Sequence, residues 1–350
     1  MNQLGIKNRL AVVLNANARS VTKQSIEMVR AAIELRPESD EKLYVSTSLE
    51  DAERISHEIM ENKFDVILSG GGDGTFCHCV TDIIGRGFAS MRHPRAFGVL
   101  RLGTGNALAD TLGVGFSRTP DELRQELDHA KDPRSKRMLT LVSTEGRIAP
   151  FAGAGLDAMI ISDYDRIKSE LDASPIKKEH RGKLEYGLAI ATKSIWKVAF
   201  NSMPKVTITN ESDKSTGAIE IGPRANEIRR FSKGDVIFQG PASMAAVSTI
   251  KHYGMGLRMF PQVNPQDRIF QLRVVSMKAY QMLAHLPAFL LGDMVHTNMK
   301  DFFCEKISMR FDRKVPFQVG GDLVGERDSV EMETAIITAI VGRKSWDPND

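Results

Sequence analysis

The glycine-rich run at residues 69–75 has the composition of a phosphate-binding loop. It reads SGGGDGT and follows an apolar stretch at residues 64–68. Glycine lacks a Cβ atom, so backbone N–H groups can approach phosphate oxygens, and a helix beginning after the run adds favourable partial charge. Asp73 lies inside the run. A carboxylate beside phosphates must hold Mg²⁺, contact a donor or accept a proton from an attacking hydroxyl, so the run points to phosphoryl transfer.

A plainer interpretation makes the run a tight connection in which Asp73 caps the next helix. A second glycine turn, GTGN at residues 103–106, favours the phosphate interpretation because it follows another apolar run, at residues 96–100. Two such turns at equivalent strand ends need a common explanation, and ligands of parallel sheets bind beyond those ends. Neither turn has the spacing of a P-loop or of a dinucleotide-binding fingerprint.

The three cysteines give no sign of a disulfide framework. Cys77, Cys79 and Cys304 are too few and too unevenly placed, which indicates a reducing compartment, and we expect a cytoplasmic protein. The consecutive residues Cys77, His78 and Cys79 invite a metal-site interpretation. Adjacent residues of a helix point in different directions and cannot jointly face one ion, so we expect these side chains to serve packing.

The glycine turns lie within an alternation of strand and helix patterns. Such an alternation predicts a doubly wound parallel sheet, whose carboxyl edge would bring both turns together. The predicted strands are residues 9–15, 42–47, 64–68 and 96–100, and the predicted helices are residues 25–35, 49–62 and 107–112.

After about residue 136 the pattern changes to short β-rich segments separated by turn residues, which predicts a second, mainly β domain. The clearest segments are residues 138–144, 206–210, 234–239 and 269–276. Residues 169–183 and 211–233 are rich in charge or in turn residues, and we expect both to be long exposed loops.

Composition excludes several classes of protein. The chain has 47 Lys and Arg against 44 Asp and Glu, a net charge of +3, which is too small to suggest a nucleic-acid partner. The apolar stretches at residues 10–14 and 279–295 are too short or too interrupted to span a bilayer.

Apolar residues at 282–291 are expected in the core rather than on a membrane-facing patch. The basic cluster at residues 177–183 fits contact with anionic lipid head groups or a solvated loop equally well.

Further motifs follow the two glycine turns in a fixed order. The set comprises LNAN at residues 14–17, the GGDGT loop at 71–75, RLGTGN at 101–106, GAGLDA at 153–158, RGKLEY at 181–186 and YGMGLRMFP at 253–261. Together they resemble the lipid kinase family that contains the diacylglycerol kinase catalytic domain, the sphingosine and ceramide kinases and their bacterial relatives.

The resemblance implies an α/β plus β fold. We expect an N-terminal doubly wound, Rossmann-like nucleotide domain of the NAD kinase and diacylglycerol kinase type, followed by a C-terminal β-sandwich domain. The expected limits are 1–136 for the ATP-binding α/β domain, 137–315 for the β-rich lipid-substrate domain, and 316–350 for a C-terminal segment that returns to the first domain. The resemblance also implies ATP and Mg²⁺ as cofactors and a nucleotide site in the cleft between the domains.

The resemblance assigns roles to individual residues. Asp157 would face the acceptor head group. The family's terminal D-G-E motif is altered to Gly320, Gly321 and Asp322, so either Asp322 acts as the catalytic carboxylate together with Glu326, or Asp73 is the base and Asp322 holds the metal. Asp73 and Asp322 are the expected metal ligands. The expected nucleotide contacts are Asn15, Thr47, Gly70, Gly71, Gly72, Gly74, Thr75, Gly103, Thr104, Gly105 and Asn106. Thr47 fits an ordinary strand end equally well.

Three functions compete at this point. The first is an ATP-dependent lipid kinase that phosphorylates a hydroxyl of diacylglycerol, ceramide or a sphingoid base while associated peripherally with a membrane. The second is a soluble NAD kinase-like enzyme, which would share the GGDG loop and the two-domain plan. The third is an inactive lipid- or nucleotide-binding protein, suggested by the altered D-G-E motif. The expected partner is a lipid at a membrane surface, and a homodimer is one assembly that we consider.

Overall fold

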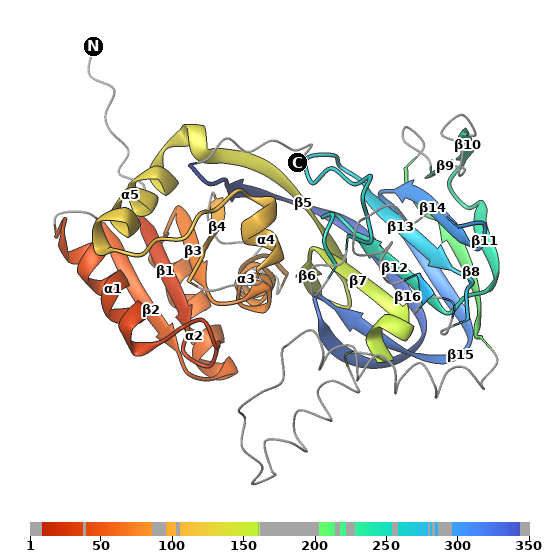
Figure 1. Cartoon of the computed structure of the whole chain (residues 1–350), viewed down its shortest axis with the longest axis horizontal. Coiled ribbons are helices and arrows are strands. Elements are labelled where there is room, and N and C mark those ends of the chain that lie inside the picture. Colours follow the sequence, from red (N-terminus) through yellow and green to blue (C-terminus); the bar gives the residue numbers. More distant parts are fainter. Residues whose placement is uncertain are drawn as a thin grey trace, which may run out of the picture.

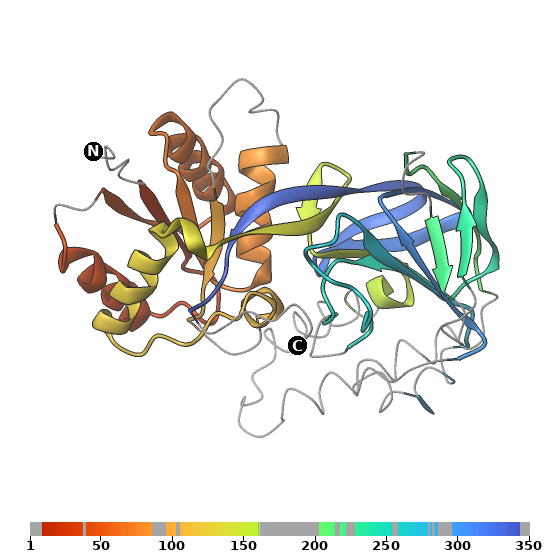
Figure 2. The ribbon, with the colours of Figure 1, turned by 90° about the horizontal axis from the view of Figure 1, so that it is seen from above.

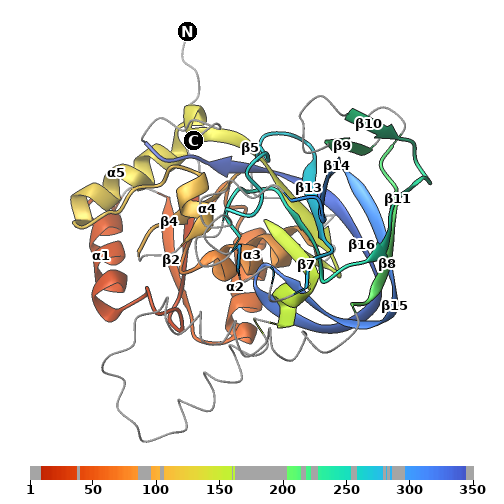
Figure 3. The same ribbon diagram turned by 45° about the vertical axis from the view of Figure 1, so that its right-hand side comes forward.

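The chain forms an α/β unit and a β unit that are joined by long strands (Figure 1). The computed structural model describes residues 9–37, 40–85, 96–102, 106–159, 161, 203–213, 218–221, 228–253, 258–278, 281, 284–285 and 296–343. Figure 3 shows the helices of the α/β unit on the left and the strands of the β unit on the right.

The α/β unit follows the predicted alternation. Its elements are β1 (Leu10–Asn15), α1 (Lys23–Glu34), β2 (Glu41–Ser46), α2 (Leu49–Glu61), β3 (Val66–Gly70), α3 (Asp73–Val80), a π-helical turn (Thr81–Gly85), β4 (Ala96–Leu100), α4 (Ala107–Thr111), α5 (Pro120–Lys131) and a 3₁₀ turn (Pro133–Ser135). The strands are parallel in the order β4-β3-β1-β2. Every predicted strand and helix of this unit is confirmed, with β3 displaced by two residues, whereas α5 was not predicted.

Both faces of this sheet are covered. In β1, Leu10, Val12 and Leu14 pack into one core cluster with residues of α1 and α5. The alternate residues Ala11 and Val13 pack into another cluster with residues of α2 and α3. Side chains of a strand point to opposite faces in turn, so the apolar run of β1 is the signature of a strand buried on both sides. The doubly wound class is confirmed.

The β unit is built around one long strand. Its elements are β5 (Lys136–Thr144), β6 (Arg147–Ala149), β7 (Phe151–Gly155), β8 (Lys205–Asn210), β9 (Ala218–Ile221), β10 (Ile228–Phe231), β11 (Val236–Pro241), β12 (Met244–Ser248), β13 (Phe270–Val275), β14 (Met299–Cys304), β15 (Lys306–Val319) and β16 (Asp322–Ile340). One end of β15 pairs with β8 and the other end with β7. The two arms of sheet that leave β15 bury a shared core, as the layers of a sandwich do.

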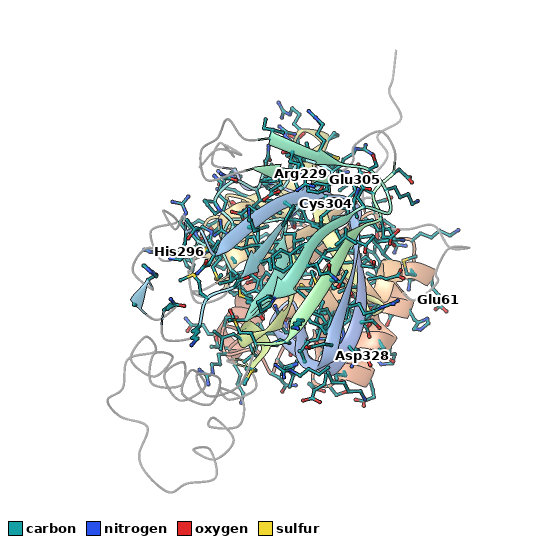
Figure 4. All side chains as sticks on the ribbon, turned by 90° about the vertical axis from the view of Figure 1, so that its right-hand side faces the viewer. Glu61, Arg229, His296, Cys304, Glu305 and Asp328 are labelled. Carbon is teal, nitrogen blue, oxygen red and sulfur yellow. The ribbon has the colours of Figure 1, made fainter. Side chains whose placement is uncertain are left out.

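Strand β16 belongs to both units. Its first part pairs with β15, while its residues 333–340 pair with β5 and Ala339 lies beside Phe97 of β4. The C-terminal segment therefore returns to the first unit, as the resemblance implied. Figure 2 shows β5 and β16 running together from the β unit to the α/β unit. Figure 4 looks onto the β unit, with Arg229 of β10 labelled in its upper part and Asp328 of β16 in its lower part.

One sequence interpretation is wrong. Residues 211–233 were expected to be a loop, but β9 and β10 lie within them and pair with each other, because Ile219 and Phe231 supply enough apolar surface for an edge hairpin. Residues 169–183, the basic cluster at 177–183 and most of the apolar segment at 282–291 lie outside the described residues. In the described part of the chain, no helix combines the length and the apolar character needed to cross a membrane. The predicted domain limits stay predictions.

A buried ion pair ties α5 to the edge of the parallel sheet. Arg124 of α5 donates to Glu41 of β2 through two guanidinium nitrogens, at 2.5 and 2.6 Å, and Lys131 also pairs with Glu41. The Glu41 side chain has no exposed surface and that of Arg124 is 7% exposed. Such a pair is costly to break from one side, because the remaining charge stays buried.

We expect Arg124→Met to lower the free energy of unfolding by about 3 kcal/mol, because Glu41 keeps only Lys131 as a partner. Arg36→Met is the matched control, since Arg36 forms an ion pair with Asp128 in which its own side chain is 56% exposed, and such pairs contribute about 1 kcal/mol or less. Urea unfolding of the three proteins measures both effects. Equal losses in the two variants would contradict the structural importance of the buried pair.

Candidate functional site

The glycine run leaves the carboxyl end of β3 and leads directly into α3. Gly72 is the N-cap of α3, and no side chain hydrogen-bonds to the backbone at this cap. Helices α1, α2, α4 and α5 each have a side-chain cap, from Thr22, Ser48, Asn106 and Thr119 respectively. The first N–H groups of a helix need an acceptor and carry positive partial charge. The start of α3 is therefore suited to hold an anion.

The glycines of the run have two different functions. A Cβ atom at Gly70 would lie 2.3 Å from Leu14 Cδ2, and one at Gly71 would lie 2.3 Å from Thr75 Oγ1. A Cβ atom at Gly72 or Gly74 would meet nothing within 4 Å. The first two glycines permit close packing of the loop, whereas the last two border open space over the start of α3, where a ligand could approach the backbone.

Asp73 links the two glycine turns. Its Oδ2 accepts a hydrogen bond from the backbone N of Ala107 and its Oδ1 accepts one from Leu108, both at 3.0 Å. These are the first residues of α4, which follows the second turn. Asn106 caps the same helix by accepting from Ala109 and also donates to the Gly71 carbonyl at 3.4 Å. Burial raises the pKa of Asp73. The hydrogen bonds from the backbone N–H groups of Leu108 and Ala107 oppose this shift.

Asn15 lies beside the glycine run at the end of β1. Its Nδ2 is 3.5 Å from Thr75 Oγ1, and its Oδ1 accepts from the backbone of Asn17. Thr47, after β2, donates its hydroxyl to Asp51 of α2 at 2.5 Å. The structure thus brings Asn15, Thr75, Asp73 and Asn106 together and places Thr47 at the end of the neighbouring strand. Gly103, Thr104 and Gly105 lie outside the described residues.

The altered D-G-E segment forms a two-residue turn between β15 and β16. Gly320 and Gly321 have φ angles of +62° and +91°, which favour glycine. Asp322 follows the turn and faces α3 and β6: its Oδ2 lies 3.6 Å from His78 Nε2 and 3.6 Å from Arg147 Nη1. The Asp322 side chain is 52% exposed. The interaction of His78 with Asp322 is the main cause of the raised pKa of His78. Partial burial of the imidazole opposes this shift.

Glu326 does not join Asp322. It lies opposite Pro316, beyond the irregular pairing at Gly325, and is exposed. Four strand residues span roughly 13 Å, so the two side chains do not form one group unless the strand rearranges. Its predicted catalytic role stays a prediction.

Asp157 lies inside the β unit and is 7% exposed. Its Oδ2 accepts hydrogen bonds from the Tyr253 hydroxyl and from Gln318 Nε2, the latter at 3.1 Å. Burial raises the pKa of Asp157, and the hydrogen bonds from Tyr253 and Gln318 oppose that shift. The acceptor-binding role implied by the resemblance stays a prediction.

The Cys-His-Cys segment is only partly a packing segment. Cys79 is buried in the core of the α/β unit and Cys77 packs against the core of the β unit. His78 instead points to Asp322 and is 41% exposed. Among the residues that the structure describes, no group of three or more His, Cys, Asp or Glu side chains could hold a metal ion.

The partners of Asp322 and Asp157 were not predicted as site residues. His78 was assigned to packing, and Arg147 and Gln318 carry no signal in the sequence, since they sit in ordinary strand patterns. The pairing of β15 with β7, and the packing of α3 against β6, bring them to the site. Only long-range strand pairing could have revealed these contacts.

The matched segment of a known family coincides with the α/β unit and its glycine loop. Residues 9–138 match the model of the diacylglycerol kinase catalytic domain family. The resemblance predicted from the motifs is thus confirmed at the level of the family, and the loop, α3 and α4 lie within the matched domain. Strands β15 and β16, with Asp322, lie outside it.

Solved structures show the same overall fold. Three structures of a diacylglycerol kinase from Bacillus anthracis strain Sterne, two of which carry that name provisionally, match this chain with TM-scores of 0.63 to 0.65 at 15 to 16% sequence identity. The matches cover 96% of this chain and 97% of those chains, so the two-unit arrangement is common to all. No curated protein matches the chain.

Proposed function

We propose that this protein is an ATP-dependent lipid kinase that transfers the γ-phosphoryl group to a hydroxyl of a lipid. The observation that carries the proposal is the start of α3, which has no side-chain cap, borders open space at Gly72 and Gly74, and lies in a domain of the diacylglycerol kinase family. A half-exposed carboxylate, Asp322, faces the same helix through its contact with His78. A phosphate cradle and a nearby carboxylate are the parts that phosphoryl transfer requires.

In this proposal the nucleotide phosphates bind along the first turn of α3. The N–H groups of the glycine run and Thr75 face the phosphate oxygens, while Asn15, Thr47 and residues 103–106 contact the rest of the nucleotide. Asp73 keeps the two turns in register through its bonds to Ala107 and Leu108. The site is then assembled before the nucleotide arrives, which limits the cost of ordering it.

Mg²⁺ fits this site as an ion held mainly by the nucleotide. In nucleotide-dependent enzymes the ion commonly keeps several waters and takes one or two carboxylates plus phosphate oxygens, so it needs no cage of protein ligands. Asp322 is the carboxylate of the site with exposed surface, and both oxygens of Asp73 already accept backbone hydrogen bonds. When bound, the ion would neutralise charge on the phosphates.

We assign the transfer of the acceptor proton to Asp322. The acceptor hydroxyl oxygen forms a bond to the γ-phosphorus while the bond from that phosphorus to the bridging oxygen of ADP breaks. The hydroxyl proton passes to the Asp322 carboxylate. His78 Nε2 and Arg147 Nη1 each lie 3.6 Å from Asp322 Oδ2, so side chains of α3 and β6 flank this carboxylate.

The acceptor class follows from the family rather than from a visible pocket. We propose a diacylglycerol, ceramide or sphingoid base presented at a membrane surface, with the protein bound peripherally from the cytoplasm. A single assay tests the activity: purified protein is incubated with labelled ATP, Mg²⁺ and, separately, vesicles of each lipid class or NAD. Labelling of one lipid supports the proposal; labelling of NAD alone favours the NAD kinase alternative, and no labelling favours a binding protein.

The glycine run allows a prediction with an internal control. Gly72→Ala is expected to leave the protein folded, because a Cβ atom there meets nothing within 4 Å, but to raise the KM for ATP about tenfold or more by obstructing the phosphates. Gly70→Ala should instead lower the melting temperature, since its Cβ atom would lie 2.3 Å from Leu14. Calorimetry and ATP titration of both variants separate the two effects. Unchanged ATP affinity in Gly72→Ala would place the phosphates elsewhere.

A further inference from the structure

Three polar side chains form a hydrogen-bonded group inside the β unit. Asp157 follows β7, Tyr253 follows β12, and Gln318 lies in β15. Asp157 Oδ2 accepts from the Tyr253 hydroxyl and from Gln318 Nε2, and Gln318 Nε2 also contacts the Tyr253 hydroxyl. Their exposed fractions are 7%, 6% and 0%. Asp157 Oδ1 is buried without a hydrogen-bond partner in the described structure, so the carboxylate is held through Oδ2. Hydrogen bonds within such a buried group constrain the positions of its members.

The surrounding structure is shaped to hold this group. Gly153 of β7 leaves it room, because a Cβ atom there would lie 2.2 Å from Asp157 Oδ2 and 2.7 Å from the Tyr253 hydroxyl. The Tyr253 ring packs against Phe151 and Phe260, with ring centroids 4.6 and 5.4 Å away. The hydroxyl of Tyr253 is thereby fixed in direction as well as in place.

The group extends to the turn that carries Asp322. Gln318 uses its amide nitrogen toward Asp157 and Tyr253, and its Oε1 accepts a hydrogen bond from the backbone N of Gly321 at 2.9 Å. Gly321 is the second residue of the turn and precedes Asp322. On the other side of the turn, Gly320 donates its N–H to the Phe151 carbonyl at 2.9 Å. The turn is therefore held at both glycines, once by the backbone and once by Gln318.

We propose that Asp157, Tyr253 and Gln318 are positioning residues that fix the turn at Gly320 and Gly321 and so hold Asp322 against α3. This inference rests on the proposed function of Asp322 in phosphoryl transfer. Glycines at both turn positions allow many backbone conformations, and the bond from Gly321 to Gln318 selects one of them. The consequence is that a change deep in the β unit alters the chemical step rather than the binding of ATP.

The test uses Gln318→Met, which keeps the side-chain volume and removes the amide. We expect kcat to fall about 10- to 100-fold through misplacement of Asp322, while the KM for ATP changes by less than about threefold. Asp157→Asn should behave likewise. A raised KM for the lipid with unchanged kcat in Asp157→Asn would overturn the proposal and return Asp157 to acceptor binding.

Thr249→Val is the matched control for loss of a buried hydrogen bond in the same unit. Thr249 is fully buried and donates to the Pro150 carbonyl at 3.1 Å, with no contact to the turn. We expect its kcat to stay within about twofold of the wild type. Equal falls in kcat for Thr249→Val and Gln318→Met would show a general loss of stability and would contradict positioning. If Gln318→Met does not fold, Tyr253→Phe replaces it, because that change removes one hydroxyl and keeps the ring in place.

A second measurement does not depend on turnover. The amide of Gly321 is protected by Gln318, so hydrogen exchange of a peptide spanning residues 317–325 should speed up in Gln318→Met and Asp157→Asn but not in Thr249→Val. If exchange speeds up in these two variants but the wild-type protein phosphorylates no lipid, the positioning of the turn stands and the kinase function is refuted. Unchanged exchange in Gln318→Met would refute the positioning itself, whatever the activity.

Discussion

Asp322→Asn is expected to reduce phosphoryl transfer by about 10²- to 10⁴-fold, which corresponds to about 3 to 5 kcal/mol in the activation barrier. The amide keeps the size of the carboxylate but carries no negative charge and cannot accept the hydroxyl proton. The side chain is 52% exposed, so the fold should tolerate the change. Initial rates with labelled ATP measure the loss, and circular dichroism verifies the fold. Full activity would show that Asp322 is not the catalytic carboxylate.

The control for Asp322→Asn is Asp328→Asn on the same strand. Asp328 is also exposed, six residues further along β16, and it lies at the edge of the face seen in Figure 4. Its replacement removes the same charge and should leave the rate within about twofold, as isolated surface charges contribute little. A second readout comes from His78: since Asp322 raises the pKa of His78, Asp322→Asn should lower that pKa toward its ordinary value, as a titration by NMR would show.

Asp73→Asn is expected to reduce phosphoryl transfer about as much as Asp322→Asn does. It should also destabilise the protein. One oxygen would be replaced by an NH₂ group that faces the backbone N–H of Ala107 or Leu108, so two donors would oppose each other. A buried donor left without an acceptor costs about 1 to 3 kcal/mol. The two glycine turns would then lose their register, and ATP affinity should fall together with the rate.

The control for this change is Asp132→Asn, which alters a carboxylate that accepts the backbone N–H of Arg134 at 2.8 Å, away from the site. The Asp132 side chain is 27% exposed, so water can reach the new amide and the activity should not change. ATP titration, transfer rates and thermal unfolding of both variants provide the comparison. If Asp73→Asn keeps its ATP affinity and loses only the rate, Asp73 acts on the chemistry directly, as the alternative base assignment requires.

The parallel sheet was predictable because its determinants are local. Apolar runs such as residues 96–100 indicate strands that are buried on both faces. The glycine turns that end these strands are recognisable in the sequence as well. Helix α5 was missed because its charged residues, among them Arg124, dilute the apolar pattern; Arg124 is nevertheless buried and paired with Glu41. An ion pair between residues 83 positions apart cannot be read from periodicity.

The candidate site was predictable in its phosphate loop but not in its second half. Asp73 was expected to serve phosphate chemistry or to cap a helix, and the structure shows it bonded to α4, a helix other than the one it begins. Asp322 was identified only by alignment to an altered motif, and its neighbours His78 and Arg147 come from α3 and β6. Their meeting depends on β16 pairing with β15, a contact that only the complete fold establishes.

The paired strands β5 and β16 determine how the two units can move. A flexible linker would let the units swing freely, but here the hydrogen-bonded ladder of residues 136–143 with residues 333–340 connects them. Any closing of the site must therefore deform this ladder. In the proposed kinase, nucleotide and lipid would be brought together by a small flexing of β5 and β16 rather than by a free hinge.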